Sequence, residues 1–300
     1  ISAPVTELIL AINAEAGNGY TGVTTINGGI LSVSDLQNGG IASAIGASSN
    51  AAANLVLSGG TLRYTGAGAS TDRLFTLSGS GGIEANGTGV LAFTSTGNIA
   101  GTGVLTLGGN SDAAILNSFR PVLTGASSLV KAGSNTWVIG AVNNSYTGAT
   151  TINGGVLQVG TLANGGSASS IGSSSNAAAN LVLNGGTLRY TGGAVTTDRL
   201  FTLGTSGGTL ESAGTGQMTM SNSGNMSLLG SGARTLTLTG SNAGTNTLTA
   251  VIGDSGGATS LVKSGAGNWI INAVNTYTGS TVVNGGILQV GTTSTHRTGT

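Results

Sequence analysis

Short stretches of four to six residues in which apolar and polar side chains alternate recur along the chain, and corners rich in Gly separate them. Two of them read TTINGGVLQV from Thr150 and NLVLNGGTLRY from Asn180. Successive side chains of an extended backbone point to opposite faces, so Leu157 and Val159 can face a core while Gln158 faces outward. No long stretch follows the 3.6-residue period of a helix. The pattern therefore predicts an all-β protein.

The spacing of the corners distinguishes between two kinds of sheet. An Asn-Gly pair between strands is typical of an antiparallel hairpin, whereas a bend that carries the chain into a second sheet produces one coil of a parallel solenoid. Six strand pairs fall within one long repeat of 131 residues, or about 22 residues per pair, which suits a three-sided β-helix with coils about 4.8 Å apart. This rhythm predicts about 13 to 14 coils. Corner residues such as Asn153 and Asn184 can then form ladders of side-chain amides between adjacent coils.

The chain also repeats itself over longer distances. The residues from Asn50, NAAANLVLSGGTLRYTG, return from Asn176 with one difference, a shift of 126 positions. Other landmarks return after 131 or 132 positions, which places an insertion of about five residues near residues 230–257. We therefore expect residues 1–300 to form one elongated β-helix whose long repeats cover about 20–145, 146–276 and, in part, 277–300. Because the chain begins partway through a unit and stops soon after Tyr277 opens the third, further repeats are expected to continue the stack.

The segment TELILAINAEAG, from Thr6 to Gly17, is the one place where a short amphipathic capping helix competes with a strand. We favour the strand, because LAINA resembles the VIGAVN and IINAVN segments of the equivalent coils.

Three segments share a longer motif. The run from Leu261 to Gly291, LVKSGAGNWIINAVNTYTGSTVVNGGILQVG, combines Lys-x-Gly, an apolar strand with Trp, Tyr-Thr-Gly and an Asn-Gly-Gly-x-Leu-x-Val corner. A second copy runs from Leu129 to Gly160, and a shorter one from Tyr20 to Val33. In these residues the chain resembles the autotransporter-associated β-strand repeat, also called the passenger-associated transport repeat. The resemblance implies a right-handed, single-stranded parallel β-helix in a large bacterial surface or secreted protein, often exported by a type V pathway.

Composition narrows the class of partner. Charged residues make up 6% of the 300 residues, and 9 basic and 9 acidic side chains give a net charge of zero. Nucleic acids and acidic membranes are normally bound by clustered Lys and Arg, so neither is an expected partner. The chain has 56 Gly and no Cys. The absence of Cys excludes a disulfide scaffold and a thiolate metal site. No apolar run is long enough to predict a membrane-spanning helix.

Most of the charged residues recur with the repeat. A scaffold position recurs with its repeat, whereas a catalytic constellation needs to exist once, so duplication favours a structural role. Arg63 and Arg189 are expected to point outward by alternation, and Asp72 and Asp198 to pair with the following Arg or to cap a corner. If Phe201 faces the core, strict alternation also turns Arg199 inward. The recurring pairs are Arg63 with Arg189, Asp72 with Asp198, Arg73 with Arg199, Glu84 with Glu211 and Lys131 with Lys263.

The other charges do not cluster in sequence. The single His, His296, lies near the end of the chain, so a Ser-His-Asp arrangement is not expected. We therefore expect no catalytic, cofactor-binding or metal-binding residue, and no cofactor. The charges that occur once are Glu7, Glu15, Asp35, Asp112, Arg120, Arg234, Asp254 and Arg297.

The aromatic residues recur in the same way, Trp137 with Trp269 among them, and are expected to pack in the core instead of forming a sugar-stacking platform. The expected function is structural and non-enzymatic: a β-helical stalk, coat or filament on the bacterial cell surface or in the extracellular space, with adhesion as a further role. Expected partners are further repeats of the same protein or end-to-end self-association, and surface glycans or a host or cell surface. Two alternatives stay open, a polysaccharide lyase or glycosidase on the same fold and a carbohydrate-binding module.

Overall fold

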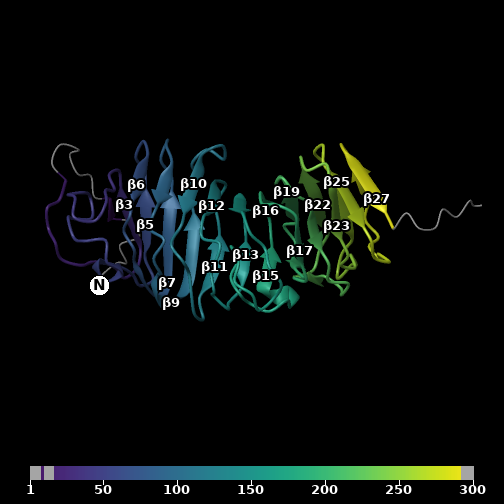
Figure 1. The fold of residues 1–300 in the computed structure, drawn as a ribbon, viewed down its shortest axis with the longest axis horizontal. Helices are drawn as coiled ribbons and strands as arrows, with labels where there is room; N and C mark the ends of the chain where they lie inside the picture. Colours follow the sequence, from purple (N-terminus) through teal and green to yellow (C-terminus); the bar gives the residue numbers. More distant parts are fainter. Residues whose placement is uncertain (1–7, 10–16, 292–300) are drawn as a thin grey trace, which may run out of the picture. The chain divides into compact units, whose positions relative to one another are not determined.

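The computed structural model describes residues 8–9 and 17–291. These residues form two compact units: the first holds the described residues up to Gln158 together with Ser167–Ser174, and the second holds Val159–Gly166 and the described residues from Ser175 onward. Within each unit the strands lie side by side, one turn after another (Figure 1). Helix in the described ranges is limited to two 3₁₀ turns, Ala52–Asn54 and Ala178–Asn180. The all-β prediction is confirmed, while the arrangement of residues 1–300 as one elongated rod stays a prediction.

The first unit stacks parallel strands. One sheet follows the order β1, β3, β5, β7, β9, β11 and β13, with β2 beside β4 and β4 beside β7, and another follows β6, β8, β10 and β12. The strands are β1 (Leu8–Ile9), β2 (Thr24–Ile26), β3 (Ile30–Val33), β4 (Leu55–Leu57), β5 (Thr61–Tyr64), β6 (Ala69–Thr71), β7 (Thr76–Ala85), β8 (Leu91–Phe93), β9 (Ala100–Gly108), β10 (Leu116–Phe119), β11 (Ser128–Lys131), β12 (Thr136–Ile139) and β13 (Thr150–Ile152). Strand β14 (Val156–Val159) has residues in both units.

The second unit presents three faces. Their strand orders are β15, β18, β21, then β16, β19, β22, β24, β26, and then β17, β20, β23, β25, β27. The strands are β15 (Leu181–Leu183), β16 (Thr187–Tyr190), β17 (Val195–Thr197), β18 (Thr202–Leu203), β19 (Gly208–Ser212), β20 (Met218–Met220), β21 (Ser227–Leu228), β22 (Arg234–Gly240), β23 (Thr245–Leu248), β24 (Thr259–Lys263), β25 (Asn268–Ile271), β26 (Thr281–Val283) and β27 (Ile287–Val290).

The length of a turn varies along the solenoid. Leu129 pairs in parallel with Thr150, whereas Leu31 pairs with Leu62, which lies about half as far again along the chain. Long turns of this kind carry loops such as residues 34–50, and they reduce the number of turns to about ten. The parallel solenoid is therefore confirmed and the estimate of 13 to 14 coils is corrected, because a uniform turn length overlooks these loops.

Alternation along the strands builds the core. Phe75, Phe93 and Phe119 pack against one another in one T-shaped and two tilted pairs, with ring centroids 6.0 to 6.3 Å apart. Trp137 is fully buried and donates its Nε1 hydrogen to the carbonyl oxygen of Gly108 at 2.9 Å. Trp269 is buried in the same way in the second unit. The prediction that these recurring aromatic residues pack inside is confirmed for the pairs Tyr64 and Tyr190, Trp137 and Trp269, and Phe75 and Phe201.

Two local predictions have mixed outcomes. Leu8 and Ile9 form a strand paired with β3, as expected, and residues 10–16 of the same segment lie outside the described residues. The amide ladder expected between Asn153 and Asn184 involves residues of both units and stays a prediction. A related contact between adjacent turns is found at another corner, where the side-chain oxygen Oδ1 of Asn86 accepts a hydrogen bond from the backbone N–H of Asn110 at 2.8 Å.

Candidate functional site

Four of the six recurring cations, Arg73, Arg199, Lys131 and Lys263, lie inside the solenoid. Arg73 is 2% exposed. Its guanidinium donates hydrogen bonds to backbone carbonyls inside the protein and does not face a surface that a substrate could reach. Its Nη1 donates to the Ser48 carbonyl at 2.9 Å, its Nη2 to the Gly46 carbonyl at 2.9 Å and its Nε to the Gln37 carbonyl at 3.0 Å. Burial lowers the pKa of Arg73, although the side chain remains a cation. The guanidinium therefore fastens the loop of residues 34–50 to the body of the first unit.

The neighbouring aspartate holds the same loop from outside. Of the two roles expected for Asp72, the structure shows the cap: its Oδ1 accepts from the Gly39 backbone N–H at 2.8 Å and its Oδ2 from the Asn50 side chain at 3.0 Å. Asp198 repeats both contacts in the second unit, with Gly165 at 2.7 Å and Asn176 at 2.9 Å.

Arg199 confirms the argument from alternation. Phe201 and Leu203 are fully buried, and Arg199, two residues before Phe201 in the segment between β17 and β18, is 2% exposed. Its Nε donates to the Ala163 carbonyl at 3.0 Å. The recurring Asp-Arg dipeptide is thus a structural device that holds a loop.

Two lysines are buried in carbonyl cages that the sequence analysis did not identify. The Nζ of Lys131 donates to the carbonyls of Ala132, Gly133 and Gly154 at 2.6 to 3.2 Å, and the side chain is fully buried. Lys263 makes the same three contacts one repeat later. A signal was present, because in LVK the Lys has the same parity as the inward-facing Leu two residues before it. Burial lowers the pKa of Lys131 to about 8 and also lowers the pKa of Lys263.

We expect the stability of the first unit to rise with pH above 8. The Lys131 pKa is about 8 in the folded chain against 10.5 for an exposed Lys. The folded state therefore loses this proton before the unfolded state does, and the free energy of unfolding rises between pH 8 and pH 10.5 by up to about 3 kcal/mol. Burial raises the pKa of Tyr64, which acts in the opposite direction above pH 10. Urea unfolding from pH 7 to 10 measures the rise.

The Lys131→Met variant is the control for this pH dependence. It removes the titrating group, so the rise between pH 8 and pH 10 is expected to shrink strongly. An equal rise in the variant would show that other groups cause it.

The recurring Arg63 and Arg189 do not simply reach into solvent. The Arg63 Nε donates to Glu84 Oε2 of the next turn at 2.7 Å, and Arg189 pairs with Glu211 at 2.8 Å. About a quarter of each side chain is exposed, so each pair contributes only about 0 to 1 kcal/mol. Parallel register places the partners opposite each other, a relation that sequence separation alone does not reveal.

Two charges that occur once come together in the second unit, at the position of the expected insertion. Compared with the first repeat, four extra residues precede Leu236 and three extra residues precede Leu261. They form two adjacent loops, residues 229–233 and 253–258, in which Gly256 lies over Ser231. In this insertion corner Arg234 directly follows the first loop, as the first residue of β22, and Asp254 lies in the second loop.

Arg234 links the two loops of the insertion corner. It is 3% exposed, and its Nη1 and Nη2 donate to five carbonyls at 2.8 to 3.1 Å, including Gly230 and Ser255. The equivalent residue of the first repeat is Gly103, where a Cβ would lie 1.4 Å from the Gly79 carbonyl oxygen. The inserted residues therefore make room for a side chain that the first repeat cannot hold.

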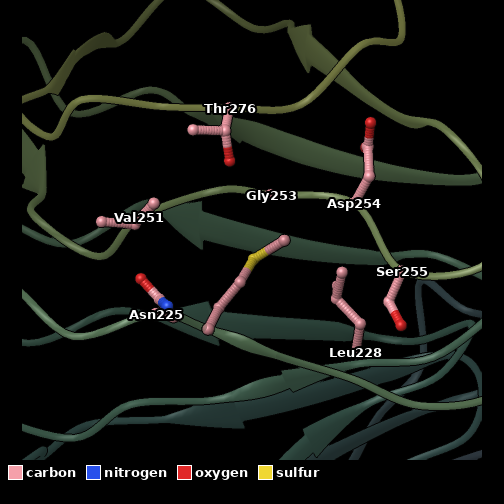
Figure 2. Close-up of a pocket in the computed structure, with 8 residues that line it drawn as sticks. Asn225, Leu228, Val251, Gly253, Asp254, Ser255 and Thr276 are labelled. Carbon is pink, nitrogen blue, oxygen red and sulfur yellow. The ribbon is translucent and has the colours of Figure 1, made fainter.

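Asp254 borders a surface hollow of about 260 Å³ in the insertion corner. In Figure 2 Val251 and Asn225 lie on one side of this hollow and Leu228 and Ser255 on the other, and the Asp254 side chain points away from Leu228. Its Oδ2 accepts from the backbone N–H and hydroxyl of Thr278 in the next turn, at 2.8 and 2.6 Å. These hydrogen bonds lower the pKa of Asp254. The group thus stays a carboxylate, which suits accepting hydrogen bonds and does not suit donating a proton as a general acid.

The remaining charges that occur once are dispersed. Asp35 accepts from the Gln37 side chain at 2.6 Å, Asp112 from the Ala114 backbone N–H at 2.8 Å, and Arg120 is exposed. Within residues 17–291 no group of three or more His, Asp or Glu side chains is placed to hold a metal ion. No helix of the described chain is long and apolar enough to cross a membrane. Four of the residues singled out in the sequence lie outside the described ranges: Glu7, Glu15, His296 and Arg297.

Comparisons with known proteins agree with this geometry. The passenger-associated-transport-repeat family matches residues 8–33, 129–159 and 261–290. A curated relative, the Adhesin BmaC autotransporter of Brucella suis biovar 1 (strain 1330), is 48% identical over 287 residues, which cover 91% of this chain and 8% of that protein. The chain thus spans less than a tenth of the length of this relative. No solved structure matches the present chain.

Stacked parallel turns, cations caged by carbonyls and a recurring Asn-Gly-Gly corner define a β-solenoid repeat protein. Three segments of the chain match the passenger-associated-transport-repeat family, and the chain is similar over most of its length to part of an autotransporter adhesin.

Proposed function

We propose that this chain is a non-enzymatic segment of a bacterial surface adhesin, exposed at the cell surface or in the extracellular space. The observation that carries the proposal is the similarity of 91% of the chain to a protein named as an autotransporter adhesin. The contacts of the recurring charges support it, because the cations hold loops and corners and the carboxylates cap or pair. In this proposal the solenoid is a stalk or coat, and its neutral, hydroxyl-rich outer faces make the adhesive contacts.

Binding of the labelled, purified chain to animal epithelial cells tests the adhesive role. We expect binding that saturates and that unlabelled chain displaces. Binding that stays linear with concentration and resists displacement would contradict an adhesive role.

Turnover assays test the non-enzymatic role. Because the described carboxylates lie in caps and ion pairs, we expect no product from acidic or neutral polysaccharides. Cleavage that falls at least a hundredfold in Glu211→Gln or Asp254→Asn would show instead that the chain is a polysaccharide-processing enzyme.

A further inference from the structure

A surface hollow of about 350 Å³ lies beside the insertion corner in the second unit. It opens over β19 and β22, which are neighbours in one sheet (Figure 1). Its volume lies within the range of about 300–1,000 Å³ that is typical of small-molecule sites. One cation, Arg234, and no aromatic side chain of the described residues line it. The residues with hydroxyl groups that line it are Thr205, Ser206, Thr209, Thr235, Thr237 and Ser260.

Most of these hydroxyl groups are free to bind a ligand. Thr205, Ser206 and Thr235 are exposed, and Thr209 and Thr237 are half-buried. Within the described ranges the hydroxyls of these five residues have no hydrogen-bond partner in the chain. A hydroxyl both donates and accepts a hydrogen bond. A group of such side chains therefore suits a ligand that itself carries several hydroxyls, as a sugar does.

Arg234 is a buried cation without a carboxylate partner. Its five hydrogen bonds all go to carbonyl oxygens, and its Nε has no acceptor among the described residues. The Nε of Arg73, by contrast, donates to a carbonyl. Asp254, in the neighbouring loop, uses its two carboxylate oxygens to accept from Thr259 and Thr278. Because a charge taken out of water without an opposite charge is costly, Arg234 attracts an anion.

The other charges of the same sheet do not cancel this attraction. Glu211 of β19 pairs with Arg189 of β16 at 2.8 Å, so the two charges neutralise each other. Lys263 of β24 lies opposite Leu238, four residues along the strand from Arg234. Four residues of a strand span about 13 Å, which exceeds the distance of about 8 Å over which physiological salt screens exposed charges. The hollow therefore combines one positive charge with a set of free hydroxyls.

The first repeat lacks this combination at the equivalent place. A scaffold contact recurs with its repeat, whereas a binding site needs to exist once. The cation and two of the hydroxyls occur in the second repeat and not in the first. The counterparts that the parallel register gives are Gly103 for Arg234, Val104 for Thr235 and Gly82 for Thr209.

We propose that this hollow binds a carboxylate-bearing sugar of an acidic glycan. The charge of Arg234 attracts the carboxylate, and the side chains of Thr209 and Thr235 form hydrogen bonds with the sugar hydroxyls. The Nε itself is covered by neighbouring atoms, so the attraction acts through space and needs no direct hydrogen bond. The role of this sugar in adhesion rests on the proposed function, whereas the binding itself does not.

Calorimetric titration of the chain with trigalacturonic acid and with its methyl ester tests the proposal. The ester keeps the sugar rings and their hydroxyls and removes the negative charges. We expect the acid to bind at least tenfold more tightly than the ester, and added salt to weaken the binding of the acid. Equal affinity for the acid and the ester, or no binding of either, would overturn the proposal.

A double variant locates the binding. Thr209→Val together with Thr235→Val removes two hydroxyls and keeps the shape of both side chains, so the acid is expected to bind at least fivefold more weakly. The matched control, Thr196→Val with Thr219→Val, changes two neighbouring threonines on another face of the same unit and is expected to bind as the original chain does. Equal affinity of the two double variants would show that the hollow is not the site.

Hydrogen exchange uses the first repeat as an internal control. The acid is expected to slow amide exchange in residues 205–209 and 235–237 and to leave residues 79–82 and 104–106 unchanged. Equal protection of both repeats would overturn the assignment to Arg234. Adherence to cells without binding of the acid would refute this ligand and leave the adhesive function standing, and binding of the acid without adherence would do the opposite.

Discussion

Replacing Arg73 with Met is expected to lower the free energy of unfolding of the first unit by about 3–5 kcal/mol. Met fills much of the volume but donates no hydrogen bond, so the carbonyls of Gln37, Gly46 and Ser48 lose their cationic donor inside the protein. Buried carbonyls without a donor each cost about 1–3 kcal/mol. Urea unfolding gives the loss, and hydrogen exchange is expected to show that residues 38–50 open first.

The Arg63→Met variant is the matched control. It removes an Arg from the same unit, but that Arg lies partly in solvent and pairs with Glu84, so a loss of at most about 1 kcal/mol is expected. Similar losses in the two variants would show that the buried hydrogen bonds of Arg73 contribute no more to stability than the partly exposed pair of Arg63 and Glu84.

Replacing Trp137 with Ala is expected to lower the free energy of unfolding by about 3–5 kcal/mol. The side chain is fully buried in the first unit, so its removal leaves a cavity that strands held in register can close only in part. The carbonyl of Gly108 also loses the hydrogen bond from Trp137 Nε1. Calorimetry and urea unfolding measure the loss.

Trp137→Phe separates the two contributions. The ring of Phe keeps most of the apolar contact and loses the Nε1 hydrogen bond, so a smaller loss than in Trp137→Ala is expected. A loss in Trp137→Ala below about 1 kcal/mol would mean that Trp137 is not held in a packed core.

Alternation and repetition predicted the fold because they record which side of the backbone is buried. Leu157 and Val159 face the core and Gln158 does not, as the alternation predicts. The same rule predicted that Arg199 is buried, because it lies two residues before the inward-facing Phe201 and its side chain therefore points to the same side of the backbone. Lys131 obeyed the rule as well and was missed, because a Lys is expected at the surface unless its partners are known.

Other features could not be predicted from the sequence, because they depend on which turns meet. The partners of Arg63 and Arg189 follow from parallel register, which loop lengths set. The number of turns was overestimated because the loop of residues 34–50 belongs to a single turn. The proximity of Arg234 to the loop that carries Asp254 depends on two insertions that stack on each other, and neither residue alone marks this corner.

The most direct test of the claim that this solenoid is an adhesive surface segment measures how beads coated with the chain adhere under flow. Beads that carry the folded chain are compared with beads that carry the same density of unfolded chain. If the outer faces of the solenoid make the adhesive contacts, the folded chain should hold beads on epithelial cells, soluble folded chain should release them, and the unfolded chain should hold far fewer. Equal adherence of folded and unfolded chain, or no adherence of either above bare beads, would contradict the claim that this solenoid is an adhesive surface segment.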